Sequence, residues 1–124
     1  MLTISNAEQD AIVNRWIATQ LHQTLEKNLP EMMNDMGEEL NIEKLVLAVS
    51  EVRPRLKAWG METERAVLKY LFGSILLGGP LEKMEPRVLP ALNSVDFHRY
   101  KKEDFMDRVI EFHLAPESER PSAS

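Results

Sequence analysis

The sequence predicts an all-α protein, a compact bundle of about four to five helices. Three observations support this fold class. Apolar residues recur in steps of three and four, which match the 3.6-residue period of an α-helix. Gly and Pro stand where these periodic stretches stop or begin. No stretch alternates apolar and polar residues between turn signals, so no strand is expected.

The first element expected is a long amphipathic helix that begins near Ser5. Ser5 and Glu8 have the spacing of a capping box, which marks a helix start. At about 100° per residue, one face of this helix is apolar and should face the core. That face holds Ala7, Ala11, Ile17, Ala18, Leu21, Leu25 and Leu29, with Val13 at its margin. Ile12 and Trp16 depart from the pattern, because they stand four apart within the opposite, polar face.

Two further helices are expected between Pro30 and Gly60. Pro30 suits the first turn of a short helix that carries Met32, Met33 and Met36. Asn41 should cap the next helix, whose apolar positions are Ile42, Leu45, Val49, Val52, Leu56 and Trp59. Their spacing continues through Pro54, which predicts one kinked helix rather than two.

The next helix should start at Thr63 or Glu62 and end at Gly78. Its stretch from Ala66 to Leu77 is apolar nearly all round, which is typical of a helix buried among others. Gly73 and Ser74 in its middle should allow a neighbouring helix to approach closely. Residues 81–94 contain two prolines and are expected to form a connector with at most a short helical turn.

A last helical region should follow Ser94 or Asp96, with Phe105, Val109 and Phe112 on one face and Met106 and Ile110 beside it. Residues 1–114 are predicted to form a single helical domain, since a chain of 124 residues suits one domain better than two. Residues 115–124 are rich in Pro, Ser and Glu and are expected to be a disordered tail.

The charge balance limits the partners. The formal net charge is −5, and the one tight basic pair, Lys101-Lys102, is followed at once by Glu103 and Asp104. Binding to nucleic acid requires clustered positive charge, so no nucleic-acid partner is expected. The most apolar stretch, Val67 to Leu77, is too short to cross a bilayer, so no membrane partner is expected either. The absence of Cys and of a signal-peptide pattern fits a cytoplasmic location.

No arrangement of residues predicts catalysis, a cofactor or a metal. His22 and Glu26 have the spacing of two ligands on a helix, but a zinc site needs three or four. Glu62 and Glu64 are better explained by the positive end of a helix than by a catalytic pair. There is no cysteine, no nucleophile motif and no phosphate-binding loop. We therefore expect a protein that is not an enzyme, with no cofactor and no catalytic or metal site.

The Ile12 and Trp16 pair is the most informative feature. Trp is enriched where partner proteins bind most strongly, which favours a contact surface. Equal weight falls on the alternative that another helix of the same domain covers the pair. If the pair binds a partner, Ile12 and Trp16 would be the apolar anchor of the site, and Glu8 would lie at its polar rim.

One segment resembles small helical accessory or immunity proteins that are encoded near bacterial type VI secretion effectors. The similarity lies in Ala58-Trp59-Gly60-Met61-Glu62-Thr63-Glu64, then Val67, Tyr70 and Leu71, then Leu76-Leu77-Gly78. It spans about residues 42–79, and Pro54 departs from the pattern. The resemblance implies a protein that binds a secreted toxin or a loading component.

The sequence thus predicts a protein-binding module whose partner is another protein, with a secreted bacterial toxin as the specific case that the resemblance implies. Such a module would neutralise or escort the toxin. An acidic chain matches a partner with a basic surface. The alternative is a homodimer, or a larger homo-oligomeric structural component, in which Ile12 and Trp16 form the seam.

Overall fold

The computed structural model describes residues 6–61, 63–94 and 99–114, and within these ranges it contains helices and turns but no strand. The prediction of an all-α protein is therefore confirmed. The helices are α1 (Asn6–Asn28), α2 (Pro30–Asp35), α3 (Ile42–Ala58), α4 (Glu64–Leu77), α5 (Leu81–Met84), α6 (Val88–Asn93) and α7 (Arg99–Leu114). Four of these are long; of the three short ones, α2 was expected at Pro30, whereas α5 and α6 come in addition. The Ser5 cap and the tail at 115–124 lie outside the described residues.

The chain divides into two compact units, residues 1–72 and residues 73–124, and the division falls within α4. Each unit has buried apolar side chains of its own. The single domain expected over residues 1–114 stays a prediction. No helix in the described part of the chain is long and apolar enough to cross a membrane.

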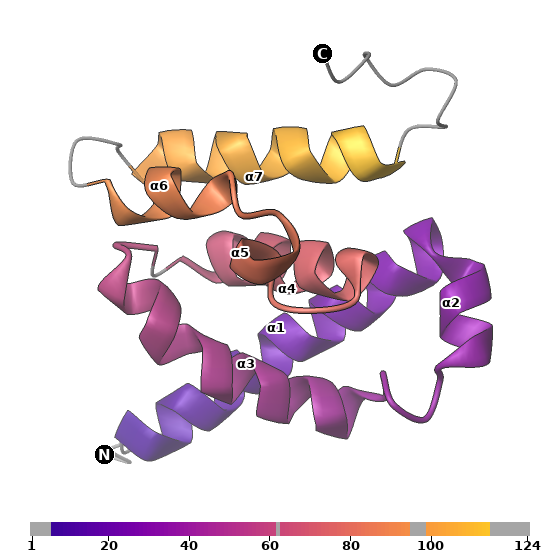
Figure 1. Ribbon diagram of the computed structural model, residues 1–124. Helices are drawn as coiled ribbons and strands as arrows, with labels where there is room; N and C mark the ends of the chain where they lie inside the picture. Colours follow the sequence, from indigo (N-terminus) through magenta and orange to yellow (C-terminus); the bar gives the residue numbers. More distant parts are fainter. Residues whose placement is uncertain (1–5, 62, 95–98, 115–124) are drawn as a thin grey trace. The chain divides into compact units, whose positions relative to one another are not determined.

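The first unit is built on the contact between α1 and α3, which cross each other in Figure 1. Both helices turn their predicted apolar faces inward. The buried side chains are Ile17, Ala18, Leu21 and Leu25 on α1 and Leu45, Val49, Val52 and Leu56 on α3. Ala11 was expected on this face but is exposed, and from Glu8 onward the first buried residue of α1 is Asn14. The start of the buried face is therefore polar.

The ends of α3 are formed as the sequence predicts. The side chain of Asn41 accepts a hydrogen bond of 2.9 Å from the backbone N–H of Lys44, which caps the first turn. The helix continues through Pro54 to Ala58. Gly60 then has a φ of 76°, and the N–H of Met61 bonds to the carbonyl of Leu56 at 2.9 Å. This is the Schellman arrangement, and only a residue tolerant of positive φ closes it without strain.

The start of α4 follows directly from this turn. The hydroxyl of Thr63 accepts from the N–H of Ala66 at 3.1 Å, so Thr63 is the cap and α4 begins at Glu64. Tyr70 then joins α4 to α3, because its hydroxyl accepts from Arg55 at 3.2 Å and its ring lies 6.3 Å from that of Trp59. The guanidinium of Arg55 lies about 6 Å from both rings, within the range of a cation–π interaction.

The second unit begins with the last turn and a half of α4. Gly73 admits close neighbours, as predicted, since a Cβ there would lie 3.3 Å from a side-chain carbon of Leu81 and 3.4 Å from one of Ile110. The hydroxyl of Ser74 accepts from the N–H of Leu81 at 3.1 Å. These contacts hold α5 and α7 against this end of α4.

The expected connector over residues 81–94 is wrong, because this segment forms α5 and α6. Pro90 is the third residue of α6, where a backbone N–H has no partner within the helix, so proline removes no hydrogen bond of the helix there. Figure 1 shows α6 beside α7. Lys102 of α7 donates a hydrogen bond of 2.7 Å to the carbonyl oxygen of Leu92 near the end of α6. Burial lowers the pKa of Lys102, because the charged ammonium loses water there.

Candidate functional site

Glu8, Ile12 and Trp16 form a row on the outside of α1, which we call the α1 stripe. The three residues are four apart, so they are neighbours along one side of the helix. Ile12 is 60% exposed and Trp16 is 54% exposed, and Glu8 is also exposed. The structure therefore places all three predicted partner-binding residues on one accessible surface.

The large apolar residues of the α1 stripe are not covered, unlike Ile17, Leu21 and Leu25 on the core face of the same helix. Full burial of a side chain such as Ile is worth roughly 1.5–3 kcal/mol, and Trp offers a still larger surface. The flank of the stripe is polar. Arg15 lies beside it and pairs with Glu43 of α3 at 3.1 Å, with both side chains largely in water. The stripe is thus an apolar pair surrounded by hydrophilic side chains, which is the usual composition of a contact centre with its rim.

His22 and Glu26 contact each other across one turn of α1. The Nδ1 of His22 lies 3.2 Å from a carboxylate oxygen of Glu26, and His22 is charged only when protonated. Among the described residues, no three or more His, Asp or Glu side chains are grouped so that they could hold a metal ion. The pair is accounted for as a contact between successive turns of α1.

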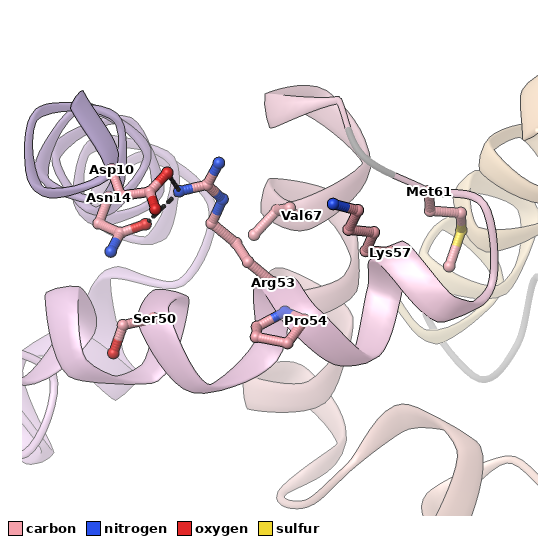
Figure 2. Close-up of a pocket in the computed structure, with 8 residues that line it drawn as sticks. All are labelled: Asp10, Asn14, Ser50, Arg53, Pro54, Lys57, Met61 and Val67. Atoms are coloured by element: carbon pink, nitrogen blue, oxygen red, sulfur yellow. Dashed lines mark hydrogen bonds and ion pairs between the residues drawn. The ribbon is translucent and has the colours of Figure 1, made fainter. Parts of the chain in front are cut away.

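A second feature, which the sequence did not predict, is a pocket of about 560 Å³ in the first unit. We call it the α1–α3 pocket. Its lining combines polar side chains of α1 and α3 with apolar ones from α3, the turn after it and α4 (Figure 2). The lining residues are Asp10, Asn14, Ser50, Arg53, Pro54, Lys57, Met61 and Val67.

Arg53 is the best-held polar group of the pocket. Its Nη1 nitrogen donates a hydrogen bond of 2.8 Å to the amide oxygen of Asn14 and one of 3.4 Å to a carboxylate oxygen of Asp10. Asn14 is only 9% exposed, and the Arg53 side chain is 28% exposed. These bonds fix the guanidinium against α1, while Figure 2 shows Lys57 reaching from the same helix as Arg53 toward Val67.

A further polar cluster lies in the second unit. Arg87 donates two hydrogen bonds to the carboxylate of Glu85, from Nε at 2.6 Å and from Nη2 at 2.9 Å. The Nε2 of His113 on α7 lies 3.5 Å from the Oε2 oxygen of Glu85, which also accepts from Nη2 of Arg87. The hydrogen bonds from Arg87 are the main reason that the pKa of Glu85 falls below its ordinary value, against the opposing effect of burial. The cluster links the turn between α5 and α6 to the end of α7.

Sequence reasoning missed the α1–α3 pocket because its polar residues come from distant parts of the chain. One local signal was present. Asp10 and Asn14 are four apart on α1, and Arg53 and Lys57 are four apart on α3, so each helix carries a polar pair on one side. Nothing in the spacing indicates that the two pairs meet.

Comparisons with protein-family models, with curated proteins and with solved structures return no match to this chain.

Proposed function

We propose that this protein is a protein-binding module whose partner docks on the α1 stripe. The observation that supports the proposal is the exposure of Ile12 and Trp16 at the centre of a polar face. Covering this pair would remove apolar surface from water, which is the main favourable term in most protein association. Trp is also the residue type most enriched among side chains whose truncation weakens binding most.

The charge of the first unit favours a basic partner. Between Lys27 and Lys44 the chain has five acidic residues and no basic one, and all five side chains are exposed. They are Glu31, Asp35, Glu38, Glu39 and Glu43. Glu43 is offset by Arg15, whereas the other four give this part of the unit an excess of negative charge. Such a surface speeds encounter with a positively charged partner, and the effect weakens as salt screens it.

The specific form of the proposal is an accessory or immunity protein that binds a secreted bacterial toxin in the cytoplasm. The resemblance of residues 42–79 to proteins encoded near type VI secretion effectors supports this form. The acidic surface also supports it, because an inhibitor can block a basic cleft by covering it with carboxylates.

The test uses the full chain as bait in an extract of its own cell, with two variants beside the wild type. Trp16→Glu places a charge in the α1 stripe. Met84→Glu makes the same kind of change at a residue of the second unit that is 49% exposed. A partner that docks on the stripe should be retained by the wild type and by Met84→Glu but not by Trp16→Glu. With the purified partner, Trp16→Glu should weaken binding by about 30-fold or more, as expected for a central Trp.

Several results would contradict the proposal. One is a purified partner that binds folded Trp16→Glu as tightly as the wild type. Another is light scattering that shows a homodimer which Trp16→Glu converts to a monomer, because the stripe would then be the seam of a self-assembly. If retention of the partner does not change as the salt concentration is raised, the part of the proposal that concerns a basic partner is contradicted.

A further inference from the structure

The α1–α3 pocket contains N–H donors of positive groups that bond to no other described residue. The side chain of Lys57 is exposed and lines the pocket, and within the described residues its ammonium makes no ion pair or hydrogen bond. An ammonium has three N–H donors, so all three are available to a ligand.

Arg53 adds donors in a fixed position. A guanidinium has five N–H bonds, and both contacts of Arg53 with the described part of the chain come from Nη1. The Nε and Nη2 groups are left for a ligand. In Figure 2 the second terminal nitrogen points away from Asp10 and Asn14. Because α1 already holds the side chain, a ligand would lose little free energy in ordering it.

The rest of the pocket is apolar and limits the charge of a ligand. Met61 and Val67 are buried and Pro54 is the third apolar lining residue. Two cations face one carboxylate, so the lining has an excess of one positive charge in a chain whose formal net charge is −5. A single negative charge on the ligand would balance this excess, whereas a second would be repelled by Asp10. The volume of about 560 Å³ is in the range of sites for small organic ligands.

We propose that the α1–α3 pocket binds a small organic monocarboxylate with a compact apolar body. The carboxylate oxygens would accept from Lys57 and from the unused N–H groups of Arg53, a geometry that guanidinium groups favour. The apolar body would lie against Pro54, Met61 and Val67. The site is independent of the α1 stripe, because at about 100° per residue Asp10 and Asn14 lie on the opposite side of α1 from Ile12 and Trp16.

The experiment follows backbone amide resonances of the full chain by NMR while phenylacetate is added. Two related probes separate the contributions: acetate keeps the charge without the apolar body, and 2-phenylethanol keeps the body without the charge. Phenylacetate should give saturable shifts confined to the pocket residues of α1, α3 and the start of α4. Both other probes should bind more weakly.

Lys57→Gln tests the assigned cation, and Lys83→Gln is its matched control, since Lys83 is an exposed lysine of α5 in the second unit. Lys57→Gln should weaken phenylacetate binding by about tenfold, the scale of one charge-assisted hydrogen bond. Lys83→Gln should leave it unchanged. Lys57 is exposed, so its variant should fold, and the amide spectrum of each variant checks this.

Any of four results would overturn the proposal. Lys57→Gln could bind phenylacetate as tightly as the wild type. The shifts could spread over both units without saturating at millimolar concentration. Inorganic phosphate, used as a further probe, could bind more tightly than phenylacetate, which would show an anion site without recognition of an apolar body. Binding by the wild type should also weaken as salt is raised, and a binding constant independent of salt would likewise exclude Lys57 as its partner.

Discussion

The Nη1 nitrogen of Arg53 donates a hydrogen bond of 2.8 Å to the amide oxygen of Asn14, and this bond joins α3 to α1. The two residues are 39 positions apart in the chain. Asn14 lies at the start of the core face of α1, next to the buried Ile17 and Ala18. The bond therefore lies at the edge of the apolar contact between the two helices. It serves two purposes, because it satisfies a buried amide and holds the guanidinium in the lining of the α1–α3 pocket.

We expect Asn14→Ala to lower the free energy of unfolding by about 1.5–3 kcal/mol, the range for hydrogen bonds to charged groups. The loss arises because Arg53 keeps its partly buried position while its closest acceptor is removed. Urea unfolding measures the change. Asp10→Asn is the control, since the exposed Asp10 lies 3.4 Å from Arg53 and should contribute no more than about 1 kcal/mol. Equal losses in the two variants would show that the Asn14 bond does not hold the helices together.

The two apolar faces of α1 should respond differently to truncation. Leu21 is 0% exposed, so Leu21→Ala should cost about 2–5 kcal/mol, because it leaves a cavity. Ile12→Ala, on the α1 stripe, should change the free energy of unfolding by no more than about 0.5 kcal/mol. Thermal or urea unfolding of both variants gives the comparison. A large loss at Ile12 would mean that the chain itself covers the stripe.

Gly60→Ala should destabilise the first unit by about 1–2 kcal/mol. The cause is the backbone, because Gly60 has a φ of 76° and a Cβ there would meet no atom within 4 Å. Gly60→Asn should cost less, since Asn adopts this conformation more readily than Ala. If Ala and Asn prove equally costly in urea unfolding, the origin of the loss is not the backbone conformation.

Glu85 should make stability depend on acidic pH. Its folded-state pKa lies below the ordinary value of 4.5, chiefly because Arg87 donates hydrogen bonds to the ionised carboxylate. The ionised form therefore stabilises the fold above the unfolded-state pKa, and this contribution is lost as the pH falls through the folded-state pKa. Glu85→Gln should be less stable than the wild type at neutral pH, and the two should converge as the pH falls below 4.5. The unfolding free energies of both proteins, measured from neutral to acidic pH, test this expectation. A difference between them that stays constant with pH would contradict it.

Local features of this fold could be predicted from the sequence, because they depend on residues close together in the chain. Asn41 caps α3, Gly60 ends it, and the apolar spacing from Ile42 to Trp59 continues through Pro54 as one helix. The error over residues 81–94 came from treating proline as a breaker. In the first turn of a helix such as α6 proline is tolerated, and composition alone does not reveal that position.

The candidate sites were predictable to a lesser degree. Periodicity placed Ile12 and Trp16 away from the core face of α1, and their exposure agrees with that. Whether a partner protein covers them stays a prediction. The α1–α3 pocket depends on which turns of α1 and α3 come together, and this pairing arises from packing between distant residues. Spacing within either helix carries no information about it.

The two tryptophans of the chain lie in different surroundings, and this makes the protein its own optical reporter. Trp16 is largely in water, whereas Trp59 is partly covered and lies beside Tyr70 and Arg55. An indole in water emits at longer wavelength and is quenched more readily by dissolved acrylamide than one packed against other side chains. Docking of a partner on the α1 stripe would shift the emission of Trp16 to shorter wavelength and protect it from the quencher, while Trp59 would report unfolding. Fluorescence of the unlabelled chain therefore separates binding from loss of structure.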